Sequence, residues 1–211
     1  MLSAPTKPDT RTAVLASARK LFAQRGYDGT SIRAITADAA ANLGAVSYHF
    51  GSKQALYLQV LDQVLAPLPP RVATAIAEAG EPLDKVDAVV RAFFDQLHDN
   101  PDQPFLILQE IAAGKPPPPP VRHVLMSTLG AVVHVIEAGQ ASGSIRPGNP
   151  LLFVLTMLSQ PVYMSLAGRA FQGEGNPDWK DPSVHSAVVE HAVAFVRAGL
   201  ASFPQEGSRS S

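Results

Sequence analysis

The 211-residue sequence contains no cysteine, which excludes disulfide bonds, cysteine-ligated metal sites and a cysteine nucleophile. Charged residues are few, at 17%, beside 46% hydrophobic residues, a balance typical of a soluble globular protein. This composition excludes wholesale disorder and a polytopic membrane protein. Strand-like alternation of apolar and polar residues is also scarce, so we expect an all-α fold.

The motifs of several large enzyme classes are missing as well. There is no GxSxG elbow, no GxxxxGK(S/T) phosphate loop and no HExxH zinc pair. Among the histidines, His185 and His191 fall on different faces of a helix, and His123 and His134 would lie about 16 Å apart along one. We therefore expect no catalytic residue, no metal ligand and no cofactor.

Membrane and targeting signals are weak. The first ten residues have no apolar run after a charged start, unlike a signal peptide. The uncharged stretch between Arg146 and Arg169 would suffice for a membrane span of about 20 residues. Prolines open this stretch, and Pro161 interrupts it. We expect a buried helix at a core or subunit interface, a cytoplasmic location and no membrane partner.

Charge is distributed unevenly along the chain. Residues 1–57 hold seven Lys and Arg and three acids, a net charge of +4. Residues 58–211 hold ten Lys and Arg and fifteen acids, a net charge of −5. A basic first segment is typical of a nucleic-acid-binding domain, although chance alone also produces a division of this size.

Helical periodicity extends along most of the chain. Near the N-terminus, this period predicts four helices, over 10–25, from Thr30 or Ser31 to about 39, over 42–49 and over 52–66. Prolines at 67, 69 and 70 then mark a joint in the chain. Further along the chain, the run of five prolines at 116–120 predicts a stiff connector between helices. The remaining predicted helices lie near 70–79, 83–99, 104–113, 121–141, 149–171 and 183–202.

The second and third short helices have the spacing of a helix-turn-helix. Six apolar residues are placed to share one small core: Phe22, Ile32, Ile35, Leu43, Val46 and Phe50. The third helix, predicted from Asn42 to His49, would be about 12 Å long, which suits insertion into a DNA major groove. Its other residues are small or able to hydrogen-bond, and none is acidic: Asn42, Gly44, Ala45, Ser47, Tyr48 and His49.

Residues 10–57 resemble the DNA-binding domain of the tetracycline-repressor (TetR) family. The resemblance rests on LFAQRGYDGTSIRAI, the later YHF and GSKQALY, and covers roughly a quarter of the chain. It implies a ligand-responsive, site-specific repressor that binds a palindromic operator as a homodimer. The family usually has glycine in the turn where this chain has Ala40, and a left-handed alanine costs about 1–2 kcal/mol.

The resemblance also assigns contacts by position. Phosphate contacts fall on Thr30, Ser31, Tyr48, His49 and Lys53. Base contacts fall on Asn42, Ala45, Ser47 and Tyr48, together with Arg33.

We expect tails over 1–9 and 204–211, a DNA-binding domain over 10–57 and a helical ligand-binding and dimerisation domain over 58–203. The interface predicted between subunits uses the helices near 149–171 and 183–202. Its apolar residues recur at helical spacing: Leu151, Val154, Leu155, Leu158, Val162 and Leu166, then Val184, Val188, His191 and Phe195.

A mostly apolar pocket for a small-molecule effector is predicted among the middle helices. Its candidate residues are Phe93, Phe94, Leu97, His98, Phe105, Leu108, Met126, His134, Met157 and Tyr163, with Glu110 and His123 as further polar neighbours. Two other functions stay open: a helical small-molecule-binding protein whose first domain does not bind DNA, and an all-α enzyme. Repression is the expected mode of regulation, with activation left open by the sequence.

Overall fold

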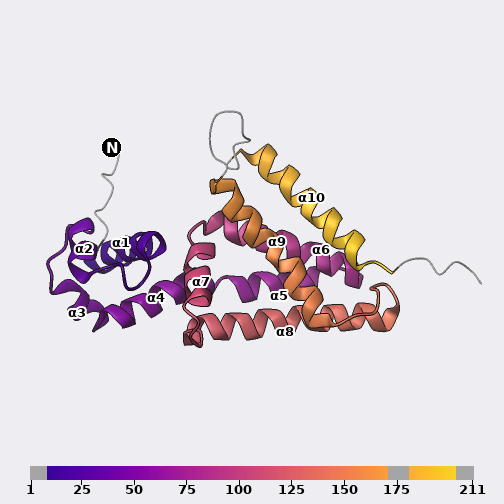
Figure 1. The fold of residues 1–211 in the computed structure, drawn as a ribbon, viewed down its shortest axis with the longest axis horizontal. Coiled ribbons are helices and arrows are strands. Elements are labelled where there is room, and N and C mark those ends of the chain that lie inside the picture. The colour runs from indigo at the N-terminus through magenta and orange to yellow at the C-terminus, as the bar shows by residue number, and fades with distance from the viewer. Residues whose placement is uncertain (1–8, 171–180, 203–211) are drawn as a thin grey trace, which may run out of the picture. The chain divides into compact units, whose positions relative to one another are not determined.

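A computed structural model describes residues 9–170 and 181–202. Within these residues the chain is helical, apart from turns and one isolated bridge between Ile145 and Ala201 (Figure 1). The all-α expectation is confirmed. The tails predicted over 1–9 and 204–211 lie outside the described residues, except for Asp9.

The chain divides into two compact units, 1–66 with 102–123 and 67–101 with 124–211. The helix-turn-helix segment predicted over 10–57 lies within the first unit. That unit also contains a later segment, because the chain returns to it at residue 102. The second boundary between the units, after residue 123, falls within one continuous helix, α8 (Pro119–Ser142).

The first unit contains α1 (Thr10–Arg25), α2 (Ile32–Asp38), α3 (Ala45–Phe50), α4 (Lys53–Leu65) and α7 (Gln103–Ala112). Side-chain oxygens cap three of these helices. Asp9 accepts a hydrogen bond from Thr12 N at 2.7 Å, Ser31 one from Ala34 N at 3.1 Å, and Ser52 one from Ala55 N at 3.0 Å.

The prediction of the third helix was wrong at its start. Helix α3 begins at Ala45 instead of Asn42, because residues 42–45 form a turn in which Ala45 N donates to Asn42 O at 3.1 Å. Leu43 therefore falls in the turn and is 54% exposed, so it is not a core residue. Phe22, Ile35, Val46 and Phe50 are buried as predicted.

The connector prediction needs a smaller correction. Residues 116–118 are not helical, but Pro119 and Pro120 form the first turn of α8. Proline is well suited to a first helical turn because its missing N–H would have no partner there.

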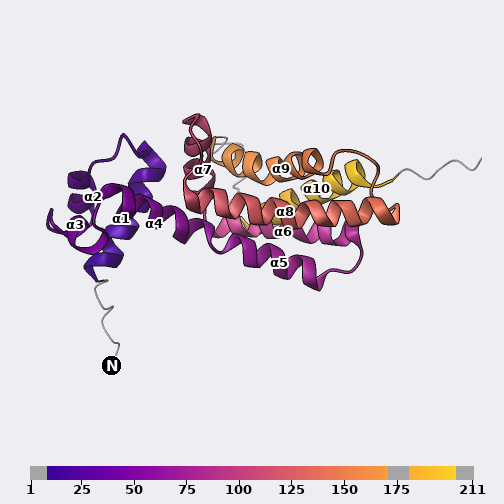
Figure 2. The ribbon, with the colours of Figure 1, turned by 90° about the horizontal axis from the view of Figure 1, so that it is seen from below.

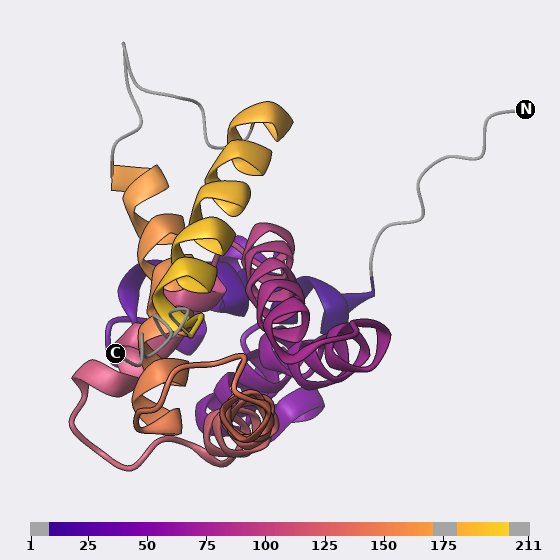
Figure 3. The same ribbon diagram turned by 90° about the vertical axis from the view of Figure 1, so that its right-hand side faces the viewer.

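The second unit is built around α6 (Pro82–Asp99). Helix α6 packs against α5 (Leu68–Glu78), α9 (Pro150–Ala170) and α10 (Pro182–Leu200), and α9 also packs against α10. Figures 2 and 3 show α5 beside α6, with α9 and α10 together beyond α6. The inner face of α6 is apolar and buried: Val86, Val89, Val90, Phe93, Phe94 and Leu97.

Polar contacts connect α6 and α10 along their length. Arg197 donates to Asp84 at 3.0 Å and also pairs with Asp87. Arg91 forms a two-pronged pair with Glu190. The α6–α10 packing is thus fixed by directional contacts as well as by its apolar core.

Candidate nucleic-acid interface

Helix α3 is held from one side and open on the other. Ala45, Val46 and Phe50 are buried in the core of the first unit. Ser47 is exposed, and the Tyr48 side chain is 86% exposed. The ring and the hydroxyl of Tyr48 are therefore both accessible to a partner of this helix.

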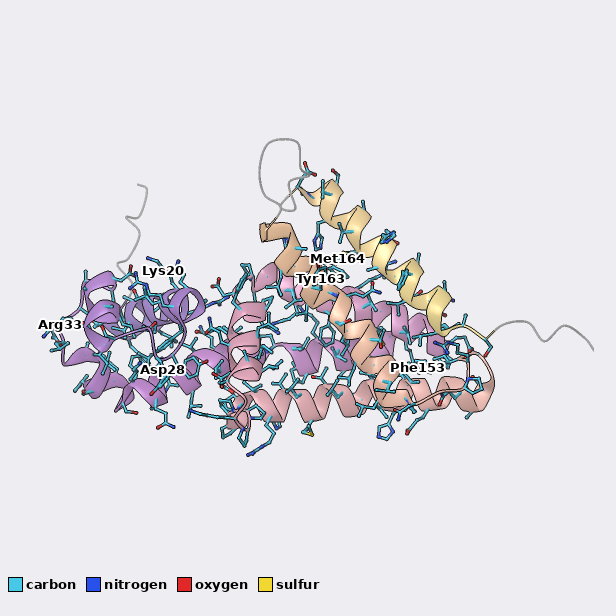
Figure 4. The ribbon with its side chains drawn as sticks, viewed as in Figure 1. Lys20, Asp28, Arg33, Phe153, Tyr163 and Met164 are labelled. Atoms are coloured by element: carbon cyan, nitrogen blue, oxygen red, sulfur yellow. The ribbon has the colours of Figure 1, made fainter. Side chains whose placement is uncertain are left out.

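Polar side chains flank the open face of α3. Arg33 on α2 is exposed and projects from the edge of the helical cluster (Figure 4). Asn42 is exposed in the turn before α3, and His49 is half-buried with its ring 4.8 Å from the ring of Tyr48. These groups place hydrogen-bond donors and one positive charge around α3. Donors can bind the acceptor atoms on base edges, and the positive charge can bind a phosphate.

Lys53 occupies the first position of α4. Its ammonium lies 4.2 Å from the centre of the Tyr27 ring, a cation–π contact that holds the side chain in place. The same first turn of α4 carries backbone N–H groups at Lys53 and Gln54 that have no partner within the helix, whereas Ala55 N donates to Ser52. A positive charge together with backbone N–H groups at a helix start is an arrangement that can bind a phosphate group.

Two of the residues assigned by resemblance are enclosed in the protein. Thr30 is 1% exposed, and its hydroxyl donates to Leu21 O at 3.1 Å and to Gly26 O at 2.8 Å. Ala45 is also buried. Both residues support the shape of the motif, and the exposed members of the set are Ser31, Arg33, Asn42, Ser47 and Tyr48.

Ala40 adopts the backbone conformation that the family usually gives to glycine. Its φ is +49°, and it is the one non-glycine residue with positive φ among the described residues. The turn is closed by a hydrogen bond of 2.9 Å from Ala41 N to Thr36 O. The turn between α2 and α3 therefore keeps its left-handed shape despite the Cβ atom.

Helix α7 packs against α1 and α4 within the first unit. Gln109 donates to Ala23 O at the end of α1, at 3.2 Å. The Tyr57 hydroxyl of α4 donates to the Glu110 carboxylate. Burial raises the pKa of Tyr57, and the Glu110 carboxylate raises it further, so the phenol remains a proton donor.

The sequence did not predict these contacts. Glu110 was a candidate neighbour of an effector pocket, and nothing in the local pattern connects it with a tyrosine 53 residues earlier. The signal available in the sequence was the polar pair Gln109–Glu110, which follows the apolar residues 104–108 of this helix.

The candidate effector residues do not form one cluster. Phe93, Phe94, Leu97 and Met157 are buried in the second unit, whereas Phe105 and Leu108 belong to the first. The remaining four side chains are exposed: His98, Met126, His134 and Tyr163. Figure 4 shows Tyr163 on α9.

The predicted subunit interface divides into two faces. Val154 and Leu158 of α9 are buried within the second unit, where α9 packs on α6. Several large apolar side chains of α9 and α10 remain exposed: Leu151, Leu152, Leu155, Tyr163 and Phe195.

Two further properties of the described residues bear on function. No group of three or more His, Asp or Glu among them is arranged to hold a metal ion. Two helices, Pro119–Ser142 and Pro150–Gly168, are long and apolar enough to cross a membrane by length and composition alone, which is weak evidence.

Comparison with known proteins decides the family. A model of "Bacterial regulatory proteins, tetR family" matches residues 14–60. The HTH-type transcriptional regulator RutR of Escherichia coli K12 is 33% identical over 164 residues, covering 71% of this chain and 72% of RutR. The chain belongs to the TetR family. Members of this family are DNA-binding transcriptional regulators and not enzymes.

Other TetR-family proteins match over most of the chain. The HTH-type transcriptional repressor NicS of Pseudomonas putida is 26% identical over 165 residues, covering 76% of this chain and 77% of NicS. The structure of the ketosteroid transcriptional regulator KstR2 of Mycobacterium tuberculosis has a TM-score of 0.73 at 20% identity, covering 95% of this chain and 98% of KstR2. The structure of AibR in complex with isovaleryl coenzyme A and operator DNA has a TM-score of 0.69 at 15% identity. The match covers 89% of this chain and 97% of AibR. These two structures share the fold of this TetR-family chain.

Proposed function

We propose that this TetR-family protein is a cytoplasmic, ligand-responsive repressor that binds a palindromic operator as a homodimer. The observation that carries the proposal is the open face of α3, where Ser47 and Tyr48 stand exposed on a helix anchored by Val46 and Phe50. In this reading α3 enters the major groove, and Tyr48 and Ser47 contact bases or phosphates. Lys53 and the start of α4 hold a neighbouring phosphate.

A homodimer follows from the size of the reading element. One helix of six residues contacts too few base pairs to select a site in a genome. The exposed apolar side chains of α9 and α10 provide a surface for a second copy, which would pair two helices from each subunit in a four-helix bundle. The two copies of α3 would then read half-sites about one helical turn, or a multiple, apart.

An effector would act on DNA affinity through the spacing of the two DNA-binding segments. Helix α7 offers a route for this effect, because it contacts α1 and α4 directly and is followed by α8, which continues into the second unit. A ligand bound in the second unit shifts DNA affinity only if it binds the two states of the protein unequally. By the same linkage, operator DNA must change the affinity for that ligand by the same factor.

Fluorescence anisotropy with the DNA flanking the protein's own gene tests the proposal. We expect tight binding to one segment, weak binding to scrambled DNA and a steep loss of affinity with added salt. Lys53→Ala should weaken binding to both duplexes and reduce the salt slope, whereas Tyr48→Ala should affect mainly the specific segment. Gln63→Ala is a matched control, since Gln63 is exposed on α4 about 15 Å along the helix from Lys53.

The same titration distinguishes the proposed repressor from a small-molecule-binding protein that does not bind DNA. A small-molecule-binding protein without DNA activity would show no salt-dependent binding to a broad genomic DNA pool at low salt. Equal ligand affinity with and without bound operator would disprove the coupling while leaving DNA recognition intact.

A further inference from the structure

Three aromatic side chains of the first unit, Phe22, Tyr27 and Tyr57, form one cluster. The centre of the Tyr57 ring lies 4.9 Å from that of Phe22 and 5.0 Å from that of Tyr27. Phe22 and Tyr57 are buried, whereas Tyr27 is half-buried. The cluster therefore extends from the core of the first unit to a ring that is partly open to solvent.

Lys53 contacts the Tyr27 end of this cluster, with its ammonium 4.2 Å from the centre of the ring. Among the described residues Lys53 forms no ion pair, unlike Lys20, whose ammonium lies 2.6 Å from the Asp38 carboxylate. An aromatic ring attracts an ammonium without neutralising its charge, and an ammonium carries three N–H donors. The contact therefore holds the charge in place and leaves donors for a phosphate oxygen.

The other end of the cluster is fixed by α7. The hydroxyl of Tyr57 donates to the carboxylate of Glu110, and both residues belong to the first unit. A hydrogen bond to a charged acceptor is strong and directional, so it sets the orientation of a ring that close packing already confines. A continuous series of contacts thus runs from Glu110 through Tyr57 and Tyr27 to Lys53.

This series of contacts bears on how readily Lys53 can bind a phosphate. A lysine side chain that is free in solvent samples many rotamers and loses this freedom when it binds. A lysine already held against Tyr27 has lost part of that freedom before DNA arrives, so ordering the side chain opposes binding less. The rings behind Tyr27 and the hydrogen bond to Glu110 keep the Tyr27 ring where this contact can form.

We infer that Tyr27, Tyr57 and Glu110 are positioning residues, which hold Lys53 ready for a DNA phosphate without touching the DNA themselves. The inference rests on the proposed function, because it concerns the phosphate contact at the start of α4. It assigns a role in DNA affinity to Glu110, a residue of α7 that lies 57 positions after the lysine in the sequence.

Fluorescence anisotropy on the full chain, with a random-sequence DNA duplex at low salt, tests the inference. A random duplex suffices because phosphate contacts do not depend on base sequence. Lys53→Ala should reduce the slope of log affinity against log salt concentration by about one per copy. Tyr27→Leu should lower the affinity about two- to fivefold, the effect of one cation–π contact near a surface, and Tyr27→Phe, which keeps the ring, should restore it.

The double variant Lys53→Ala with Tyr27→Leu shows whether Tyr27 acts through Lys53. In the Lys53→Ala background, Tyr27→Leu should cause no further loss of affinity. Glu110→Ala should behave in the same way with a smaller loss, and Glu110→Gln, which keeps an acceptor for the Tyr57 hydroxyl, should restore the affinity. Losses that add in the double variant, or an unchanged affinity in Tyr27→Leu, would overturn the inference.

A matched control removes a ring from beneath a cation in the second unit. The Phe153 ring is half-buried, like that of Tyr27, and its centre lies 4.6 Å from the guanidinium carbon of Arg146. Phe153→Leu should leave the affinity and the salt slope unchanged, and a loss equal to that of Tyr27→Leu would refute the role of Tyr27. If Tyr27→Leu does not fold, the cycle of Glu110→Ala with Lys53→Ala gives the same decision.

The outcomes also separate this inference from the proposed function. If the wild-type protein binds no duplex at any salt concentration, the proposed function itself is wrong. If the wild-type protein binds and Tyr27→Leu binds equally well, DNA binding stands and only the positioning of Lys53 is refuted.

Discussion

The two units of this protein expose different kinds of surface. The first unit buries Phe22, Phe50 and Tyr57 and surrounds α3 mainly with polar or hydroxyl-bearing side chains, apart from the exposed Leu43. The second unit leaves Leu152 and Phe195 exposed on α9 and α10. A surface with donors and positive charge is suited to a hydrated, negatively charged partner, whereas an apolar surface gains only from a partner that excludes water. The difference supports the proposal that each unit binds a partner of a different class.

The largest expected effect contrasts two phenylalanines. Phe22→Ala removes a fully buried ring from the first unit and should lower the free energy of unfolding by about 3–5 kcal/mol. Phe195→Ala removes a ring that is 61% exposed and should change the unfolding of the monomer by less than about 0.5 kcal/mol while weakening dimerisation. Urea denaturation and sedimentation equilibrium measure the two quantities. A Phe195→Ala variant with an unchanged dimer dissociation constant would remove α10 from the interface.

The second prediction concerns DNA affinity without loss of stability. Tyr48→Ala should weaken specific binding by about 1–3 kcal/mol, in the range found for one good base contact. Its unfolding should be unchanged, because the side chain is 86% exposed. Anisotropy and thermal denaturation on the same sample measure both effects, and Tyr48→Phe separates the hydroxyl from the ring. A fall in stability equal to the loss of affinity would assign Tyr48 a packing role instead.

The third prediction concerns the contacts of α7. Tyr57→Phe removes the hydroxyl that donates to Glu110 and should cost about 1–2 kcal/mol of stability. It should also speed hydrogen exchange in α7. Tyr163→Phe is the control, since the Tyr163 side chain lies exposed on α9. If the two variants exchange alike, the Tyr57–Glu110 contact does not hold α7 to the first unit.

The smallest expected effect concerns the left-handed turn. Ala40→Gly relieves the cost of positive φ but adds freedom to the unfolded chain, so we expect a net gain of about 0.5–1 kcal/mol. Gly51→Ala places a Cβ atom at φ +80° and should change stability in the opposite direction. Chemical denaturation measures both. A destabilised Ala40→Gly variant would contradict the inferred strain.

The sequence determined the helices and the type of motif. The caps at Asp9, Ser31 and Ser52 are local, since each side chain accepts from a backbone N–H three residues ahead. The 3.6-residue period likewise predicted the ends of the helices to within two residues, except at the start of α3, which differs by three. Local hydrogen bonds and periodicity are encoded in neighbouring residues, so they can be inferred before any tertiary contact is known.

Only the tertiary structure decided what covers each face. The apolar residues of α9 look equivalent in the sequence, yet Val154 is buried against the unit's own helices and Leu155 is exposed. Thr30 resembled a phosphate ligand until its hydroxyl was found to be buried, and Glu110 resembled a pocket residue until it was found to contact Tyr57. A helical period fixes which residues share a face, but the partner of that face is set by packing between segments far apart in the chain.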